Sequence, residues 1–189
     1  MHLCKEHFLE DFEHKVRRNI RRFNMVKRCD KIAVALSGGK DSSVTLHILA
    51  ELFAARRDLE IIAITVDEGI TPYRDGTISS AKELTASLGI EHHFITFSEN
   101  YGITLDEIVG IDGGHPCTYC GVFRKTLLNK VARGENATKL ATGHNLDDEA
   151  QSILMNHLRG DIERLRRLLP ARRHSALVPR IKPLMDVPE

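Results

Sequence analysis

The sequence predicts a doubly wound α/β fold with a mostly parallel sheet, preceded by a basic N-terminal helix. Runs of apolar, β-branched residues alternate with segments whose apolar residues recur at helical spacing, as in successive strand–helix units. One of these runs, at residues 61–66, is apolar without alternation, which is typical of a parallel strand covered on both faces. This alternation implies right-handed crossovers and an open doubly wound sheet, in which ligands bind beyond the carboxyl ends of the strands.

The expected elements follow one another in a regular order. Residues 1–30 come first: their apolar residues recur every three or four positions from Phe8 to Phe23 and predict an amphipathic helix. Its basic positions include Lys15, Arg17, Arg18, Arg21 and Arg22, a face that is either solvated or contacts phosphate backbones. Strands are then expected at residues 31–36, 59–66, 92–97 and 138–142. Helices are expected near residues 42–57, 77–88, 121–133 and 146–159, with a short helical stretch near 105–109.

Composition narrows the class of protein. With 189 residues, 42% hydrophobic and 28% charged, the chain suits one sizeable globular domain, at residues 31–189, and the helical extension at residues 1–30. The apolar stretches are too short to span a bilayer, and Met1 is followed by polar residues rather than by a signal peptide. We therefore expect a cytoplasmic protein without membrane contact, in which cysteines bind metal or act in catalysis rather than form disulfides.

The loop after the first strand has the composition of a phosphate-binding loop. Its glycines let the backbone turn sharply and approach an anion, and the following helix directs its positive end to the same place. Asp41 either caps that helix or holds a magnesium ion that bridges phosphates. A Walker loop and a dinucleotide fingerprint each need a further glycine, which this loop lacks. The loop consists of Ser37, Gly38, Gly39, Lys40, Asp41 and Ser42.

Two cysteine motifs suggest metal chemistry. Cys117 and Cys120 lie in a glycine-rich stretch ahead of the helix that carries Arg124. A Cys-x-x-Cys pair suits a redox dithiol, half of a zinc site, or two ligands of an iron–sulfur cluster. The redox role is less favoured because the pair is not at the first βα turn, as it is in thioredoxin-like folds. Near the N-terminus, Cys4 and His7 form a Cys-x-x-His pair, two ligands that do not fill a tetrahedral zinc site by themselves.

Polar residues also follow the fourth strand. Gly143 would let backbone approach a ligand, and His144 either contacts phosphate or caps the strand end. Asp147 and Asp148 fall in the first turn of the next helix, where capping explains one of them, and magnesium binding or proton abstraction would suit the pair. A later basic cluster is either solvated or grips nucleic acid. It consists of Arg164, Arg166, Arg167, Arg172 and Arg173.

Three motifs in order, at residues 37–42, 116–121 and 141–149, resemble those of the tRNA 2-thiolation enzymes, the tRNA 2-thiouridine synthetases of the PP-loop ATP pyrophosphatase superfamily. The resemblance runs from about Cys4 to the end of the chain. It implies a Rossmann-like PP-loop ATPase domain that uses ATP and Mg²⁺ to adenylate O2 of a tRNA uridine, after which sulfur replaces the oxygen. It also implies a [4Fe-4S] cluster, a ubiquitin-like sulfur-carrier protein and a homodimer.

The resemblance assigns a role to each motif. It implies that the loop at residues 37–42 binds ATP phosphates, that Gly143 lies by the nucleotide, and that Asp148 is the catalytic acid–base residue. It places Arg124 near the active site, and makes Cys117 and Cys120 ligands of the cluster.

The chain departs from this pattern at both ends, and we expect it to be truncated there. Cys4 and His7 match the second half of a family zinc finger, which would hold a structural Zn²⁺ if its first half were present. Family members also continue beyond residue 189 and supply a third cluster cysteine. Cys29 is expected to be structural. Two alternatives share the loop: a PP-loop enzyme that adenylates a small molecule, and an ATP-binding module without chemistry.

Overall fold

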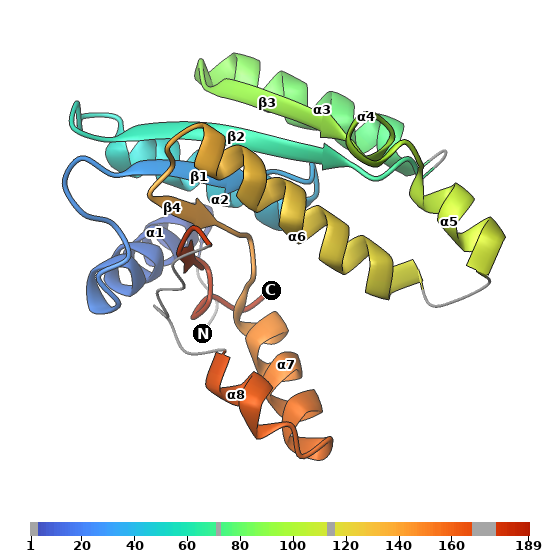
Figure 1. Cartoon of the computed structure of the whole chain (residues 1–189). Coiled ribbons are helices and arrows are strands. Elements are labelled where there is room, and N and C mark those ends of the chain that lie inside the picture. Colours follow the sequence, from blue (N-terminus) through green and yellow to red (C-terminus); the bar gives the residue numbers. More distant parts are fainter. Residues whose placement is uncertain (1–3, 71–72, 113–115, 168–176) are drawn as a thin grey trace.

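The computed structural model, which describes residues 4–70, 73–112, 116–167 and 177–189, has the expected α/β architecture (Figure 1). Five strands form one sheet in the order β3-β2-β1-β4-β5, and every pairing is parallel. Ile32 in the central strand pairs with Ile61 on one side and Lys139 on the other. The strands are β1 (Lys31–Ala35), β2 (Glu60–Asp67), β3 (Glu91–Thr96), β4 (Lys139–Ala141) and β5 (Arg180–Ile181).

Helices cover both faces of this sheet. The first three lie on one face, and α6 crosses the other face diagonally (Figure 1). A parallel sheet of this kind needs cover on both sides, since each strand carries apolar side chains on both. The helices are α1 (Lys5–Arg22), α2 (Lys40–Phe53), α3 (Tyr73–Leu88), α4 (Phe97–Tyr101), α5 (Leu105–Asp112), α6 (Pro116–Gly134), α7 (Leu146–Leu158) and α8 (Ile162–Arg167).

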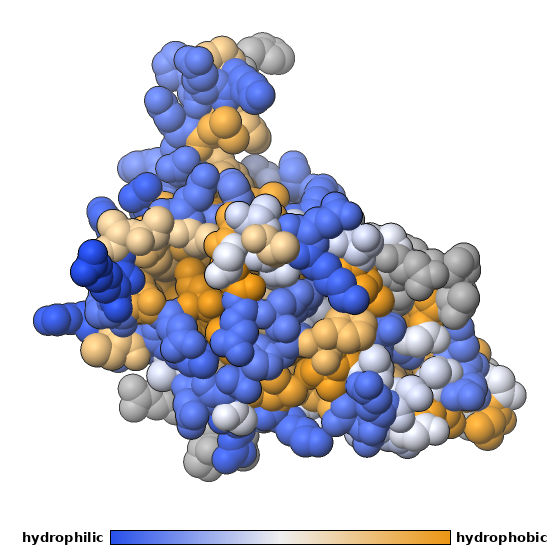
Figure 2. All heavy atoms as spheres, turned by 90° about the horizontal axis from the view of Figure 1, so that it is seen from above, coloured by the Kyte–Doolittle hydropathy of each residue, from blue (hydrophilic) through white to orange (hydrophobic). Residues whose placement is uncertain are grey.

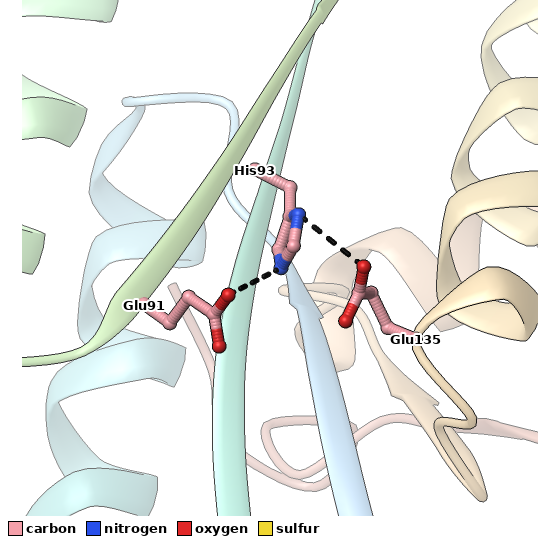
Figure 3. A group of neighbouring side chains, drawn as sticks. All are labelled: Glu91, His93 and Glu135. Carbon is pink, nitrogen blue, oxygen red and sulfur yellow. Dashed lines mark ion pairs between the residues drawn. The ribbon is translucent and has the colours of Figure 1, made fainter.

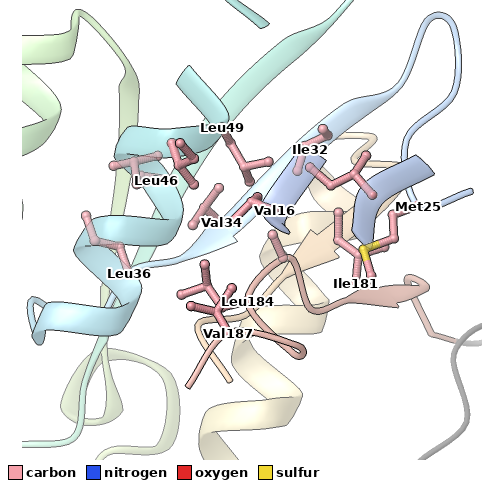
Figure 4. Packing of buried hydrophobic residues seen from close by; sticks show 14 of the residues in the cluster. Val16, Met25, Ile32, Val34, Leu36, Leu46, Leu49, Ile181, Leu184 and Val187 are labelled. Atoms are coloured by element: carbon pink, nitrogen blue, oxygen red, sulfur yellow. The ribbon is translucent and has the colours of Figure 1, made fainter. Parts of the chain in front are cut away.

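Two apolar clusters hold the layers together, one on each face. Figure 4 shows the first, in which Val34 of β1 packs against Leu46 and Leu49 of α2. Ile62 of β2 points to the second cluster, with Leu127 of α6. All of these side chains are buried, and each contributes about 1.5–3 kcal/mol relative to an exposed side chain. The strand at residues 61–66 is thus buried on both faces, as the sequence predicted.

The N-terminal helix belongs to the first of these clusters. Val16 and Ile20 of α1 are buried against the sheet layer, as the amphipathic pattern predicted. Asn19, also buried, donates a hydrogen bond from Nδ2 to the carbonyl of Pro183 at 3.0 Å. Two interactions therefore anchor α1: its buried apolar face packs on the sheet layer, and Asn19 bonds to the C-terminal segment. A domain boundary at residue 30 stays a prediction.

The helix with the cysteine pair begins earlier than predicted. α6 starts at Pro116 rather than near residue 121, so Cys117 and Cys120 lie in its first turns and not in a preceding loop. Proline is favoured at the first helical position, because its fixed φ suits the helix and its missing N–H is not needed there. The three short elements α4, α8 and β5 were not expected.

No helix in the described ranges is long and apolar enough to cross a membrane. In the view from above, hydrophilic residues cover much of the face and hydrophobic residues show between them (Figure 2).

Candidate functional site

The carboxyl ends of β1 and β4 meet at the point where the strand order reverses. The chain runs outward from β1 to β2 and β3, then crosses back to place β4 on the other side of β1. In open α/β sheets, ligands bind in the crevice at such a switch point. The loop at residues 37–42 follows β1, and Gly143 follows β4. Two of the predicted motifs therefore come together at this crevice.

The loop at residues 37–42, called the PP-loop from here on, is ordered by its two serines. The hydroxyl of Ser42 donates to the carbonyl of Gly39 at 2.9 Å and lies 3.0 Å from the Ser37 hydroxyl. It also accepts the backbone N–H of Ser37 at 3.2 Å. Gly39 is the N-cap of α2, with no side-chain capping bond, so Asp41 does not cap the helix. The magnesium role therefore remains for Asp41 as a prediction.

Gly38 and Gly143 allow close packing around the loop. Gly38 has φ +82°, and a Cβ there would lie 1.9 Å from the carbonyl oxygen of Thr77 in α3. A Cβ on Gly143 would lie 2.8 Å from backbone atoms of Asp41 and Ser42. Both contacts involve backbone, which cannot move aside as a flexible side chain can. The segment after β4 therefore packs directly on the first turn of α2.

Lys40 is tied to the C-terminal end of the described chain. Its ammonium group forms an ion pair with Glu189, although both side chains are largely exposed. The backbone N–H of Glu189 donates to Oδ2 of Asp147 at 2.8 Å. One carboxylate thus lies where Lys40 would meet an anion, and Asp147 holds the segment that carries it.

Asp148 has a structural role at the start of α7. It forms a capping box with Asn145: its Oδ2 accepts the N–H of Asn145 at 3.1 Å, and its own N–H donates to Oδ1 of Asn145 at 3.0 Å. Capping therefore explains Asp148, while Asp147 bonds elsewhere. In the same turn, buried Glu149 forms an ion pair with Lys182. An acid–base role for Asp148 stays a prediction.

His144 lies between β4 and this cap. Its Nδ1 is 3.0 Å from the hydroxyl of Thr142. Desolvation by the surrounding protein, and then the positive charge of Lys182, lower the pKa of His144 from its ordinary value. The ring is therefore neutral at pH 7, so toward a phosphate it offers one hydrogen bond and no formal charge.

Arg124 reaches the end of β2 from α6. Its guanidinium lies 3.3 Å from Oε1 of Glu68, whose side chain is only 2% exposed. Cys120 is one helical turn before Arg124, on the same face of α6, and is partly buried. Glu68 was not among the predicted site residues. Its signal is a pair of acidic residues, Asp67 and Glu68, that follows the continuous apolar run at residues 61–66.

The remaining cysteines lie elsewhere. Cys29 is exposed, with φ +60°, in the turn before β1, and so is not a buried structural cysteine. Nearby Lys31 contacts Glu135 at the far end of α6, and fifteen helical residues from Cys120 to Glu135 span roughly 22 Å. Cys29 thus lies at the end of the sheet where the strands begin, far from the cysteine pair.

The Cys-x-x-His pair has the geometry of a half-site. Sγ of Cys4 lies 3.0 Å from Nδ1 of His7, across the first turn of α1. Both residues are exposed. Two ligands at this spacing leave two positions of a tetrahedral ion to be filled by other groups.

Positive charge gathers around the start of β5. Burial and the charges of Arg180, Arg124 and Arg164 lower the pKa of Lys125. Helix α6, strand β5 and helix α8 thus each direct a cation to one region. Of the predicted basic cluster, Arg164 pairs with Asp161 at 3.1 Å. Arg172 and Arg173 lie outside the described residues, as do the side chains of Arg166, Arg167 and Cys117.

Comparison with known proteins shows which family the chain belongs to. Residues 12–189 match the PP-loop domain family, and the chain belongs to it. It is 42% identical to the tRNA 2-thiolation protein NcsA of Haloferax volcanii, over the whole chain and 64% of that protein. It is also 42% identical to cytoplasmic tRNA 2-thiolation protein 1 of Drosophila melanogaster, over 96% of the chain and 54% of that protein.

Solved structures show the same fold. The U34-tRNA thiolase NcsA from Methanococcus maripaludis, solved with its [4Fe-4S] cluster, is 41% identical and has a TM-score of 0.88, covering 98% of this chain and 61% of that one. A glutamine-dependent NAD⁺ synthetase from Acinetobacter baumannii, at 16% identity and TM-score 0.59, shares the fold alone. The chain spans about half to two thirds of the length of its tRNA-thiolation relatives.

Proposed function

We propose that this chain is the nucleotide-binding part of an ATP-dependent tRNA sulfurtransferase that makes 2-thiouridine. The observation that carries the proposal is the meeting of the PP-loop and the segment after β4 at one switch point, with Arg124 held at the end of neighbouring β2. The names of the relatives at 42% identity support the same activity.

The PP-loop would bind the phosphates of ATP. The backbone N–H groups at the start of α2, the helix dipole and the Lys40 ammonium all favour an anion there. ATP phosphate would replace the Glu189 carboxylate as the partner of Lys40. Asp41, in the first turn and free of a capping role, would hold the Mg²⁺ that bridges phosphates.

The reaction would balance in two steps. In the first, O2 of the uridine bonds to the α-phosphorus of ATP, the bond from that phosphorus to the bridging oxygen breaks, and pyrophosphate leaves. Asp148 would take up the proton that uridine N3 loses. In the second, hydrosulfide-level sulfur bonds to C2, the C2–O2 bond breaks to release AMP, and the proton of the S–H group passes to N3 to leave the thiocarbonyl. Fixed positive charge at the PP-loop would stabilise the leaving pyrophosphate.

The cysteine pair fits an iron–sulfur cluster in its donor chemistry. Positions 117 and 120 lie in the first turns of α6, and a Cys-x-x-Cys pair can supply two thiolate ligands of such a cluster. When bound, the cluster would supply an iron that carries sulfur. Arg124, one turn further on, would place positive charge beside it, and Glu68 would hold Arg124 in that position.

The substrate tRNA would contact the basic face of α1. A surface pocket on this helix is lined by His14, Arg17, Arg18, Arg21 and Arg22. Arg17 pairs with Glu13 and Arg22 with Asp186, whereas Arg18 and Arg21 have no acidic partner in the part of the chain described. Two unpaired, exposed guanidinium groups are suited to a phosphate backbone.

The double substitution Arg18→Gln and Arg21→Gln is expected to weaken tRNA binding several-fold and to reduce the slope of log K against log[salt] by about 1.5. The reason is that binding releases fewer counterions from the tRNA when two phosphate contacts are missing. Binding would be measured by filter retention at several salt concentrations. The control is Arg56→Gln, because Arg56 is held by two 2.6 Å bonds to Asp58 in a turn elsewhere. An unchanged slope in the double variant would place tRNA on another surface.

The function is tested by the product of ATP turnover, measured anaerobically with and without tRNA. We expect AMP and pyrophosphate only when tRNA is present, with 2-thiouridine detected by nucleoside mass spectrometry. ADP would contradict PP-loop chemistry, and AMP formed without tRNA would indicate adenylation of a small molecule. Lys40→Gln should abolish turnover, whereas Lys130→Gln, at an exposed site that bonds Asn100, should not.

Several details rest on the resemblance. Zinc at Cys4 and His7, the sulfur-carrier protein and the homodimer stay predictions. A cytoplasmic location is proposed in line with the name of the Drosophila relative.

A further inference from the structure

We propose a divalent-metal site, suited to Zn²⁺, formed by Glu91, His93 and Glu135 (Figure 3). The site lies at the end of the sheet where the strands begin, whereas the PP-loop lies at their carboxyl end. Glu91 and His93 lie on β3, and Glu135 directly follows α6. One ligand atom from each residue lies within 4.8 Å of the other two. One imidazole nitrogen and two carboxylate oxygens, with water as a fourth ligand, form a donor set that zinc accepts.

The separations of these atoms suit a shared ion. Nε2 of His93 lies 3.3 Å from Oε1 of Glu91. Two ligand atoms that are each about 2.1 Å from zinc lie roughly 3.4 Å apart at the tetrahedral angle. Figure 3 shows the ring between the two carboxylates, with Nδ1 at 3.7 Å from Oε1 of Glu135. An ion at Nε2 would require the Glu135 side chain to turn from the Nδ1 side of the ring toward it.

A buried ring nitrogen points to a ligand independently. Nε2 of His93 is buried and has no hydrogen-bond partner among the residues described. The Glu91 oxygen is close enough for an ion pair but is not directed as a hydrogen bond. Leaving a buried polar atom without a bond costs free energy. A metal ion at Nε2 would supply that bond.

The surrounding charges favour a cation. Lys31 lies 2.8 Å from Glu60 but 3.7 Å from Glu135. Glu60 is therefore the nearer ion-pair partner of Lys31. Glu91 has an ion pair only with His93 among the described groups. The carboxylates of Glu91 and Glu135 thus place negative charge on both sides of the His93 ring, where a divalent ion would neutralise it.

Such an ion would have a structural role. β3 is an edge strand of the sheet, and the three ligands would join it to the C-terminal end of α6. The site lies roughly 22 Å along α6 from Cys120, so it is separate from the proposed catalytic crevice. Zinc binding is expected to raise the melting temperature, since the ion binds the folded chain in preference to the unfolded one.

The test uses a background in which Cys4, Cys29, Cys117 and Cys120 are replaced by serine, because thiolates would also bind zinc. Equilibrium dialysis against Zn²⁺, with the metal counted by mass spectrometry, should find one ion per chain. The melting temperature should rise by several degrees. Adding Glu91→Gln or His93→Gln should weaken zinc binding at least tenfold and remove the rise.

The matched control is His47→Gln. His47 also lies 3.2 Å from a glutamate, Glu51, but no third ligand joins that pair in the described structure. This variant should bind zinc like the background. No bound zinc in the background, or equal binding by the His93→Gln variant, would overturn the site and leave an ion-pair cluster. Glu91→Gln decides the question if His93→Gln does not fold, because the Glu91 side chain is 61% exposed.

Discussion

Replacing Gly38 with alanine is expected to abolish ATP turnover and to lower the free energy of unfolding by about 3 kcal/mol. Two causes add together. Gly38 has φ +82°, a backbone conformation that alanine adopts only with strain, and the new Cβ would meet the carbonyl oxygen of Thr77 at 1.9 Å. Relief of that contact requires the PP-loop or α3 to move. Urea denaturation and a turnover assay measure the two effects.

Two other glycines separate strain from contact in this experiment. Gly89 has φ +63° but open space around it, so Gly89→Ala should cost about 1 kcal/mol and leave ATP binding intact. Gly39→Ala meets only the Ser37 hydroxyl, at 3.5 Å, so it should fold normally. If Gly39→Ala still loses ATP affinity, the ligand itself needs the bare backbone. Normal turnover by Gly38→Ala would contradict the role of the loop.

Replacing Asp148 with asparagine is expected to lower the rate of tRNA-dependent AMP formation at least a hundredfold with little loss of stability. Asparagine keeps an oxygen that can accept the Asn145 N–H, as Oδ2 of Asp148 does at 3.1 Å, but it cannot take up a proton at neutral pH. General base catalysis contributes factors of about 10² to 10⁴. Single-turnover kinetics and thermal unfolding give both quantities.

The capping role of Asp148 is tested by Asn145→Ala. This change removes the bond from Oδ1 of Asn145 to the N–H of Asp148 and should cost about 1 kcal/mol, but it keeps the Asp148 carboxylate. Its rate should fall much less than that of Asp148→Asn. If the two variants lose activity in proportion to their lost stability, Asp148 is a capping residue alone.

The sequence predicted the features that depend on local pattern. The buried strand at residues 61–66 and the PP-loop between β1 and α2 were each read from neighbouring residues. The start of α6 was placed too late, because a glycine-rich stretch suggested a loop although Pro116 is a good first helical residue. β5 consists of two residues, and only its pairing with Leu140 and Ala141 makes it a strand.

Contacts between distant segments could not be predicted in this way. The bond between Arg124 and Glu68 joins α6 to the end of β2, and nothing near either residue indicates the other. The same holds for Glu135 and His93, which meet only because α6 runs back to the starting edge of the sheet. Asn145 is different, because it lies only three residues before Asp148 and their capping box could have been read from the local sequence.

The pairing of β4 with β1 has a consequence for how the protein folds. Thr138 and Lys31 hydrogen-bond across a separation of 107 residues, and this pairing puts Gly143 against the PP-loop. Contacts of such long range require a large loop to close and form slowly. A nascent chain that ends before residue 138 would hold the whole PP-loop, yet it would lack one wall of the crevice. ATP would therefore select chains that have completed this pairing, and binding would stabilise them against unfolding.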